Sequence, residues 1–457
     1  MIEMIKTGVL WVLIVSSIVM TWMLWSYQPD YRSTNEEPDE SYVEIEDIGE
    51  SRSLSAVIHP REVISHQGEN IDYISSKDNL YKTVLDELQD VEIDYLVQRG
   101  NHNAPSLDRS IDNAIELIFD EAVPGEIMEE ILTIEDNDLP LEQIDRLVAA
   151  ENDSSVGAEV VLQFVDIEHE QIYEADTDIS AGQLDDIRES GEGASASAEP
   201  RVFEEDPESE FQQVRYVLTE ELTVNQYTYE TTDLSPQAFR QVLFSDPDFV
   251  EEYHQTGNEN AYTDGNRMMH ILDDGMILSF SQTDVHNGIR AGDDHIIDDT
   301  RSFVNGHSGW TDTFYWDDFT EYDTEEHVSY RMHVDGIPVM SSNTNQSEYY
   351  MMEMERRGED ITEYTRPLYQ LAEEPIDTET DRELAPFSEV ETFIEENESF
   401  AVDEVQDIQI GHYMNRNRSF SAFEPSWFVL VRDRWIELEM HERDDSDDPE
   451  VTADGLE

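Results

Sequence analysis

The chain has 457 residues, no cysteine, and 108 acidic side chains against 26 basic ones, which gives a formal net charge of −82. A surface of this sign excludes a nucleic-acid-binding body and makes an anionic lipid surface a poor partner for most of the chain. The lack of cysteine excludes disulfides, thiolate nucleophiles and cysteine-ligated metal sites. Hydrophobic residues at 38% and aromatic residues at 10% suffice to fill cores, so the acidity does not indicate disorder.

Lysine occurs only at Lys6, Lys77 and Lys82, and the other basic residues are arginines. Few lysines together with many carboxylates indicate a folded surface adapted to high salt. At molar salt the Debye length falls to roughly 3 Å, so most of the self-repulsion is screened. We therefore expect a protein of a halophile.

The first predicted element is a transmembrane helix over residues 7–27, because no charged residue occurs from Thr7 to Gln28. A cleaved signal peptide is the alternative, but no small-residue cleavage site follows the apolar run. Lys6 precedes the helix, which favours a cytoplasmic N-terminus over residues 1–6 and an exported body. We expect a single-pass protein of the cell membrane.

The predicted helix is the segment to which a function can be assigned. Ser17 and Thr21 are spaced i, i+4 and share one face, with Ser16 beside them and Trp22 and Trp25 near the helix end. Small and hydroxyl side chains let helices in a bilayer approach closely and hydrogen-bond across the contact. These five residues are candidates for partner binding. The alternative is that the hydroxyls only bond carbonyls of their own helix.

The body is predicted to be α+β, with about three exported domains that combine antiparallel sheets and helices. Its elements in chain order include a helix over 79–88, strands over 111–119 and 160–165, hairpins over 268–281, 330–340 and 427–438, and a helix over 387–396. The expected segments are an acidic tether 28–50, an N-terminal domain 51–188, a linker or exposed loop 189–200, a central domain 201–287, a C-terminal domain 288–441 and an acidic tail 442–457.

No catalytic, cofactor-binding or metal site is predicted. None of the 13 histidines falls in a motif such as H-E-x-x-H, and Glu325-Glu326-His327 stands on its own. The acidic run Asp444–Asp448 lacks the glycine and the closing glutamate of a calcium loop. Ser308 has no identifiable base, and no G-x-S-x-G or phosphate loop occurs.

Several segments together resemble the YycH family of membrane-anchored regulators of Gram-positive bacteria. The first is the helix end and its exit, Ile18-Val19-Met20-Thr21-Trp22-Met23-Leu24-Trp25-Ser26-Tyr27-Gln28-Pro29-Asp30-Tyr31. The second is Ser302-Phe303-Val304-Asn305-Gly306-His307-Ser308-Gly309-Trp310-Thr311-Asp312, which is similar to the family's FIN-x-H-x-GWT-D stretch. The hairpin from Tyr330 to Val339 and the block from Ile58 to Gln67 add weaker matches.

The resemblance implies a single-span protein whose exported body folds into three α+β domains. It also implies a function: control of the WalK (YycG) sensor histidine kinase of cell-wall metabolism, exerted with a YycI-like partner through contacts between transmembrane helices. Two other functions stay open from the residues, an anchored extracellular enzyme or ligand-binding protein, and a structural surface protein. A pocket with convergent polar groups would favour the former over a regulator.

Overall fold

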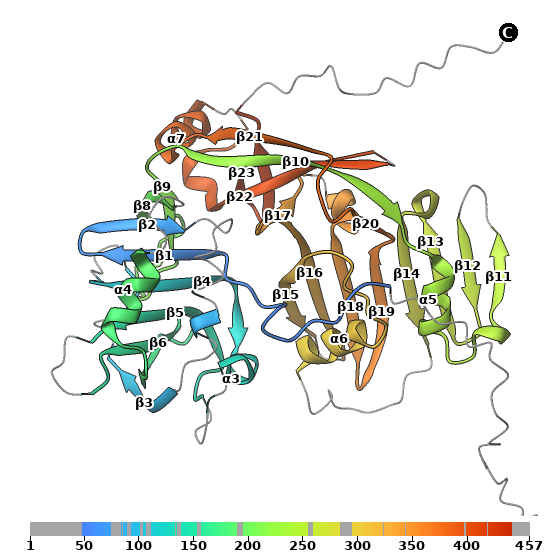
Figure 1. Ribbon diagram of the computed structural model, residues 1–457, viewed down its shortest axis with the longest axis horizontal. Helices are drawn as coiled ribbons and strands as arrows, with labels where there is room; N and C mark the ends of the chain where they lie inside the picture. The colour runs from blue at the N-terminus through green and yellow to red at the C-terminus, as the bar shows by residue number, and fades with distance from the viewer. Residues whose placement is uncertain are drawn as a thin grey trace, which may run out of the picture. The chain divides into compact units, whose positions relative to one another are not determined.

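The computed structural model describes residues 48–440, apart from gaps at 75–83, 85, 89–92, 101–103, 107–110, 133, 135–138, 153–156, 190–194, 255–258, 284–294, 323, 343, 397–398 and 418. This part of the chain is α+β, with two large, mainly antiparallel sheets and few helices (Figure 1). The fold class expected for the body is therefore confirmed. The predicted transmembrane helix 7–27 and the tail 442–457 lie outside the described residues. Among the described helices, none is long and apolar enough to cross a membrane.

The first sheet has nine strands in the order β3-β7-β6-β5-β4-β1-β2-β8-β9, and every neighbouring pair is antiparallel. Its strands are β1 (Glu62–Gln67), β2 (Asn70–Ile74), β3 (Ile93–Arg99), β4 (Ala114–Pro124), β5 (Gln143–Glu151), β6 (Val160–Asp166), β7 (Gln171–Thr177), β8 (Ser195–Val202) and β9 (Val214–Leu218). Helix α3 (Gly125–Leu132) contacts β4 and β5, and α4 (Ala181–Glu189) contacts β4. The apolar run of β6 is buried over its whole length, as expected of a central strand.

The prediction of a linker or exposed loop over 189–200 is wrong for residues 195–200, which belong to β8. This strand pairs with β2 on one side and with β9 on the other. Its side chains are mostly small, so hydrophobic patterning gave no strand signal. The backbone hydrogen bonds to two flanking strands stabilise it instead.

The second sheet has fifteen strands, and its main path runs β11-β12-β13-β14-β19-β18-β16-β17-β22-β23-β10-β20. The strands on this path are β10 (Leu222–Asp233), β11 (Glu251–His254), β12 (Asn260–Thr263), β13 (Arg267–Leu272), β14 (Ile277–Gln282), β16 (Glu326–Val334), β17 (Ile337–Met340), β18 (Met351–Arg357), β19 (Asp360–Pro367), β20 (Tyr369–Leu371), β22 (Val405–Arg416) and β23 (Phe420–Val431). Three more pair at its margins: β15 (Phe314–Glu321) with β16, β21 (Asp377–Leu384) with β10, and β24 (Arg434–Leu438) with β23.

The helices of this half are α5 (Pro236–Leu243), α6 (Ile296–Asn305) and α7 (Phe387–Glu396), with 3-10 turns η2 (Pro247–Phe249), η3 (Asp273–Gly275), η4 (Thr344–Tyr349) and η5 (Val402–Glu404). Helix α7 has the bounds predicted for it. The predicted hairpin at 330–340 is β16–β17, with left-handed φ angles of 53° at Asp335 and 76° at Gly336. Such angles at both central residues suit the twist of a two-residue hairpin. The hairpins predicted at 268–281 and 427–438 are also present, as β13–β14 and β23–β24.

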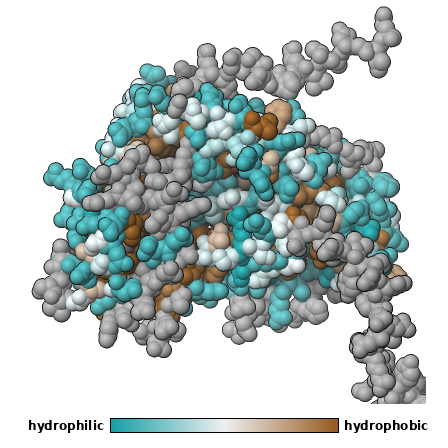
Figure 2. Space-filling view, in the orientation of Figure 1, coloured by the Kyte–Doolittle hydropathy of each residue, from teal (hydrophilic) through white to brown (hydrophobic). Residues whose placement is uncertain are grey.

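The fifteen-stranded sheet takes strands from both of the predicted domains 201–287 and 288–441. The division of the body into three domains stays a prediction. A second, smaller core forms where α7 covers β22 to β24, and it includes Val217 of β9 from the first sheet. The visible surface is mainly hydrophilic, with apolar side chains in small separate groups (Figure 2).

Candidate functional site: the junction that receives the N-terminal segment

The five residues predicted to bind a partner, Ser16, Ser17, Thr21, Trp22 and Trp25, lie outside the described residues. The structure does describe the chain from residue 48 onward, where it comes from the predicted helix and tether. We call residues 48–61 the junction segment. Its contacts determine how the body holds the chain that leads to the predicted anchor.

Asn305, the last residue of α6, fastens the junction segment through its side-chain amide. Its Oδ1 accepts the backbone N–H of Arg52 at 2.8 Å, and its Nδ2 donates to the carbonyl oxygen of Arg52 at 2.9 Å. Arg301 of the same helix donates from Nη1 to that carbonyl at 3.1 Å. Both backbone groups of Arg52 are therefore bonded to one helix face.

Trp310 pairs with the junction segment through its backbone. The N–H of Glu50 donates to the Trp310 carbonyl at 2.9 Å, and the Trp310 N–H donates to the Glu50 carbonyl at 3.3 Å, which forms an antiparallel bridge. The approach is so close that a Cβ added at Gly49 would lie 2.4 Å from the Trp310 oxygen. Only glycine fits at position 49 without displacing the bridge.

The indole of Trp310 connects the two contacts. Its Nε1–H donates to Oδ1 of Asn305 at 2.8 Å, so one amide oxygen serves both Arg52 and Trp310. The ring is 2% exposed and meets Tyr330 edge-on, with 5.1 Å between centroids. Tyr330 in turn hydrogen-bonds Thr300 of α6 at 2.9 Å. The tryptophan is thus held in the core. We call Asn305 and Trp310, together with their hydrogen bonds to Glu50 and Arg52, the clamp.

The other residues of the G-W-T-D stretch fix this loop to the second sheet. Arg366 of β19 is fully buried and donates to the Gly309 carbonyl at 2.5 Å and to the Thr311 hydroxyl at 2.8 Å. Asp312 accepts the backbone N–H of Leu371 at 2.9 Å. Removal of Asp312 from water raises the pKa of its carboxyl to about 6, partly offset by these hydrogen bonds and by Arg366.

Further along, the junction segment stays attached to β15. The N–H of Trp316 donates to the Val57 carbonyl at 2.7 Å, and the ring of His59 stacks on Tyr315 at 4.1 Å. His333 of β16 packs edge-on against the same tyrosine at 4.9 Å. Burial lowers the pKa of His333 to about 4, so its imidazole is neutral at physiological pH.

The junction segment ends in a buried charge cluster formed by Arg61, Arg215 and Asp407. Arg61 makes a two-point ion pair with Asp407 of β22, with distances of 2.7 and 3.1 Å, and Nη2 of Arg215 on β9 lies 3.1 Å from the same carboxylate. The side chain of Arg61 is 3% exposed. The two guanidinium groups outweigh the cost of burying Asp407 and lower its pKa to about 2. This cluster ties the start of the first sheet to the second.

From the sequence, Asn305 and Trp310 belong to a motif, and Trp310 is expected to be a core or interface residue, but no partner for either residue is predicted. Glu50 falls in the predicted tether and Arg52 in the predicted first domain. The motif itself contained a signal for a contact with another segment of backbone. An asparagine at a helix end and a tryptophan five residues on are suited to bonding another backbone. The segment that they contact, about 250 residues earlier in the chain, could not be inferred from local pattern.

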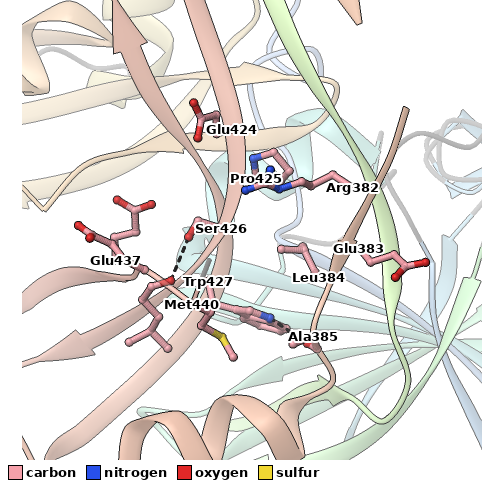
Figure 3. A pocket seen from close by; sticks show the side chains of 12 residues that line it. Arg382, Glu383, Leu384, Ala385, Glu424, Pro425, Ser426, Trp427, Glu437 and Met440 are labelled. Atoms are coloured by element: carbon pink, nitrogen blue, oxygen red, sulfur yellow. Dashed lines mark hydrogen bonds between the residues drawn. The ribbon is translucent and has the colours of Figure 1, made fainter. Parts of the chain in front are cut away.

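A pocket between β21, β23 and β24 does not have the features of a ligand site. The volume of this cavity is about 30 Å³, enough for roughly one water molecule. Glu383, Glu424 and Glu437 point in different directions around it (Figure 3). The Trp427 indole N–H is already used, because it donates to the Ala385 carbonyl at 3.0 Å. This pocket offers no convergent polar groups.

Comparisons with known proteins cover almost the whole chain. The family model for the YycH protein N-terminal domain matches residues 3–192, and that for the YycH protein C-terminal domain matches residues 212–445. A curated relative from Bacillus subtilis (strain 168), the two-component system WalR/WalK regulatory protein YycH, is 22% identical over 450 residues, which is 95% of this chain and 96% of the relative.

A crystal structure of YycH from Bacillus subtilis shares the fold, with a TM-score of 0.67. The match covers 86% of this chain and 98% of that one, at 17% identity. These matches confirm the resemblance to the family. The chain belongs to the YycH family.

Proposed function

We propose that this chain is a non-enzymatic, membrane-anchored regulator of a two-component sensor histidine kinase of the WalK type, which controls cell-wall metabolism. The proposal rests on family membership and on the regulatory role stated in the name of the Bacillus subtilis relative. Residues 1–6 would face the cytoplasm, 7–27 would cross the membrane and the body would lie outside the cell. A YycI-like protein would act beside it.

In this proposal the transmembrane helix, residues 7–27, transmits the signal. Ser17 and Thr21, with Ser16, would contact the helices of the kinase or of the YycI-like partner. Trp22 and Trp25 would sit at the outer interface, where aromatic side chains are enriched. The helix would then bias the packing of the kinase helices without catalysis.

A structural feature that supports the proposal is the clamp on the junction segment, formed by the hydrogen bonds that Asn305 and Trp310 make to it. These bonds fix Glu50 and Arg52 to the end of helix α6 and to the loop that follows it. A body that moved when it bound a partner would therefore move residue 50, about 20 residues after the predicted helix.

The helix is tested by co-purification from detergent with the host's sensor kinase and its YycI-like protein. Wild type is compared with a chain whose residues 8–26 are scrambled, in the salt that the host uses. We expect the kinase to associate with wild type and to be lost with the scramble. If the scrambled chain retains the kinase, the exported body makes the contact and the helix mechanism is wrong.

The clamp is tested separately with Asn305→Ala, which removes the hydrogen bonds to Arg52 and to the Trp310 indole. We expect this variant to keep kinase association but to lose most of its effect on kinase output, measured with a reporter gene. Gly49→Ala should act in the same way, because its Cβ collides with the Trp310 carbonyl. Asn415→Ala, at an exposed position of β22, is the matched control. Normal regulation by both clamp variants would contradict the idea that the clamp connects the body to the control of the kinase.

A further inference from the structure

One face of the second sheet carries a row of ligand-type side chains on three neighbouring strands. His327 of β16 lies directly opposite Glu355 of β18, and Glu355 lies directly opposite Glu363 of β19. Glu325 precedes β16 and adds a third carboxylate. These residues line or adjoin an open cleft with a volume of about 340 Å³.

Glu325, His327 and Glu355 converge closely enough to share one ion. Nε2 of His327 lies 3.6 Å from Oε1 of Glu325 and 3.8 Å from Oε2 of Glu355, and the three ligand atoms lie within 4.8 Å of one another. Metal–nitrogen and metal–oxygen distances of about 2.0–2.2 Å in a tetrahedral zinc site place ligand atoms roughly 3.3 Å apart. The two histidine–carboxylate distances would have to shorten by about 0.3–0.5 Å, and the two carboxylate oxygens, which lie within 4.8 Å of each other, by up to about 1.5 Å to complete such a set.

Other side chains hold the far oxygens of both carboxylates and leave the near ones directed at the histidine. Arg357 contacts Oε2 of Glu325 at 2.9 Å and Oε1 of Glu355 at 2.6 Å. Thr362 donates to the same Glu355 oxygen at 2.9 Å. The ring of Tyr322 meets His327 edge-on at 5.3 Å. Partners of this kind orient the ligands in known metal sites.

The charge balance of the row favours a cation independently of the ligand geometry. Like charges placed directly opposite on neighbouring strands are destabilising, and Glu355 faces Glu363 in this way, with Glu353 on the same strand lining the cleft. Arg357 supplies a single positive charge against these carboxylates and Glu325. A bound divalent cation would offset the remaining repulsion.

We propose that Glu325, His327 and Glu355 form a site for a divalent transition-metal ion of the zinc type, open to the cleft for a fourth ligand. One imidazole with two carboxylates suits zinc better than calcium or magnesium, which take sets of oxygen ligands. From the sequence alone, only Glu325 and His327 can be expected to lie close together, because they are two residues apart. Glu355 lies 28 residues after His327 and joins the site through strand pairing.

The test is calorimetric titration of Zn²⁺ into the full-length chain in detergent, at molar NaCl with millimolar Mg²⁺ to suppress binding to scattered carboxylates. We expect one saturable site in wild type. His327→Ala should weaken it at least tenfold, and Glu325→Gln should weaken it as well. The control is His254→Ala, since His254 is exposed and has one carboxylate at 3.8 Å, that of Glu252; it should leave the affinity unchanged.

Co²⁺ provides a second measurement, because its visible absorption reports a low-coordinate nitrogen and oxygen environment. We expect these bands in wild type and in His254→Ala, and their loss in His327→Ala. The side chain of His327 is 42% exposed, so its replacement should leave the fold intact, as checked by circular dichroism. No saturable binding by wild type, or equal affinity in His327→Ala, would overturn the proposal.

Discussion

At the scale of single residues, the arginines explain how so acidic a chain keeps its interior neutral. Arg146, Arg356 and Arg366 are among the largest fully buried side chains of the described residues. Each is bonded to acidic groups or to backbone carbonyls, as in the pair of Arg146 with Glu116 at 2.9 Å. Arginine is suited to this position because its planar fork satisfies several acceptors and its charge is weakly hydrated.

The pairing of buried arginines with carboxylates is most easily tested at Asp407. Asp407→Asn removes the carboxylate that Arg61 and Arg215 share. Arg61 keeps Asp120 and Glu62 as acidic partners, whereas Arg215 loses its ion pair. We expect the free energy of unfolding to fall by about 3–5 kcal/mol, measured by urea denaturation. The control is Glu199→Gln, because the pair of Glu199 with Arg201 is 45% and 44% exposed and should contribute less than about 1 kcal/mol.

The stabilisation that the Asp407 carboxylate provides should depend on pH, and the sign of this dependence follows from its lowered pKa. The pKa of Asp407 is lowered to about 2 in the folded chain, so its contribution is complete above pH 4 and is lost as the pH falls towards 2. Wild type and Asp407→Asn should therefore converge in stability over that range. A constant difference down to pH 2 would show that the ion pair is not the cause.

At the scale of elements, the junction segment and β15–β16 depend on neutral histidines. His333 packs with Tyr315 and, more distantly, with His59, at 6.1 Å between ring centroids. Burial lowers the pKa values of both histidines below the ordinary value, to about 4 for His333. Protonation of either ring would put a charge where the fold has removed water.

We expect the free energy of unfolding to fall in acid because of these histidines. Between about pH 6.5 and 4 the unfolded chain binds a proton at His333 that the folded chain does not, so stability falls as the pH falls through this window, by up to about 1.4 kcal/mol per pH unit. His333→Phe keeps an aromatic ring and should remove this part of the slope, measured by denaturation at each pH. His254→Ala, at an exposed position, should keep it. An unchanged slope in His333→Phe would contradict the assignment.

At the scale of the whole molecule, the charge of −82 predicts a strong dependence on salt. The Debye length falls from about 10 Å at 0.1 M to about 3 Å at 1 M, so repulsion between surface carboxylates is screened over this range. We expect the unfolding temperature to rise by several degrees between these concentrations. Near pH 4.1, the isoelectric point, the net charge vanishes and the same salt step should have little effect. Equal effects at both pH values would point to salt exclusion instead of charge screening.

Local pattern was enough to predict many elements of the body. Helix α7 and the hairpins β13–β14, β16–β17 and β23–β24 were expected from apolar periodicity and from turn residues such as Asp335-Gly336. These signals act over a few residues, so they can be read without the fold. Strand β8 was missed because its side chains are small and its stability comes from strands on both sides.

The sequence by itself determined the α+β class of the body, its strong negative charge, the family resemblance and the predicted anchor. Only the tertiary structure decided which distant segments meet: Asn305 and Trp310 with the junction segment, Arg61 with Asp407, and His327 with Glu355. The physical reason is that apolar periodicity and turn chemistry are local. Strand order and the pairing of buried charges depend on how the whole chain removes its apolar surface from water.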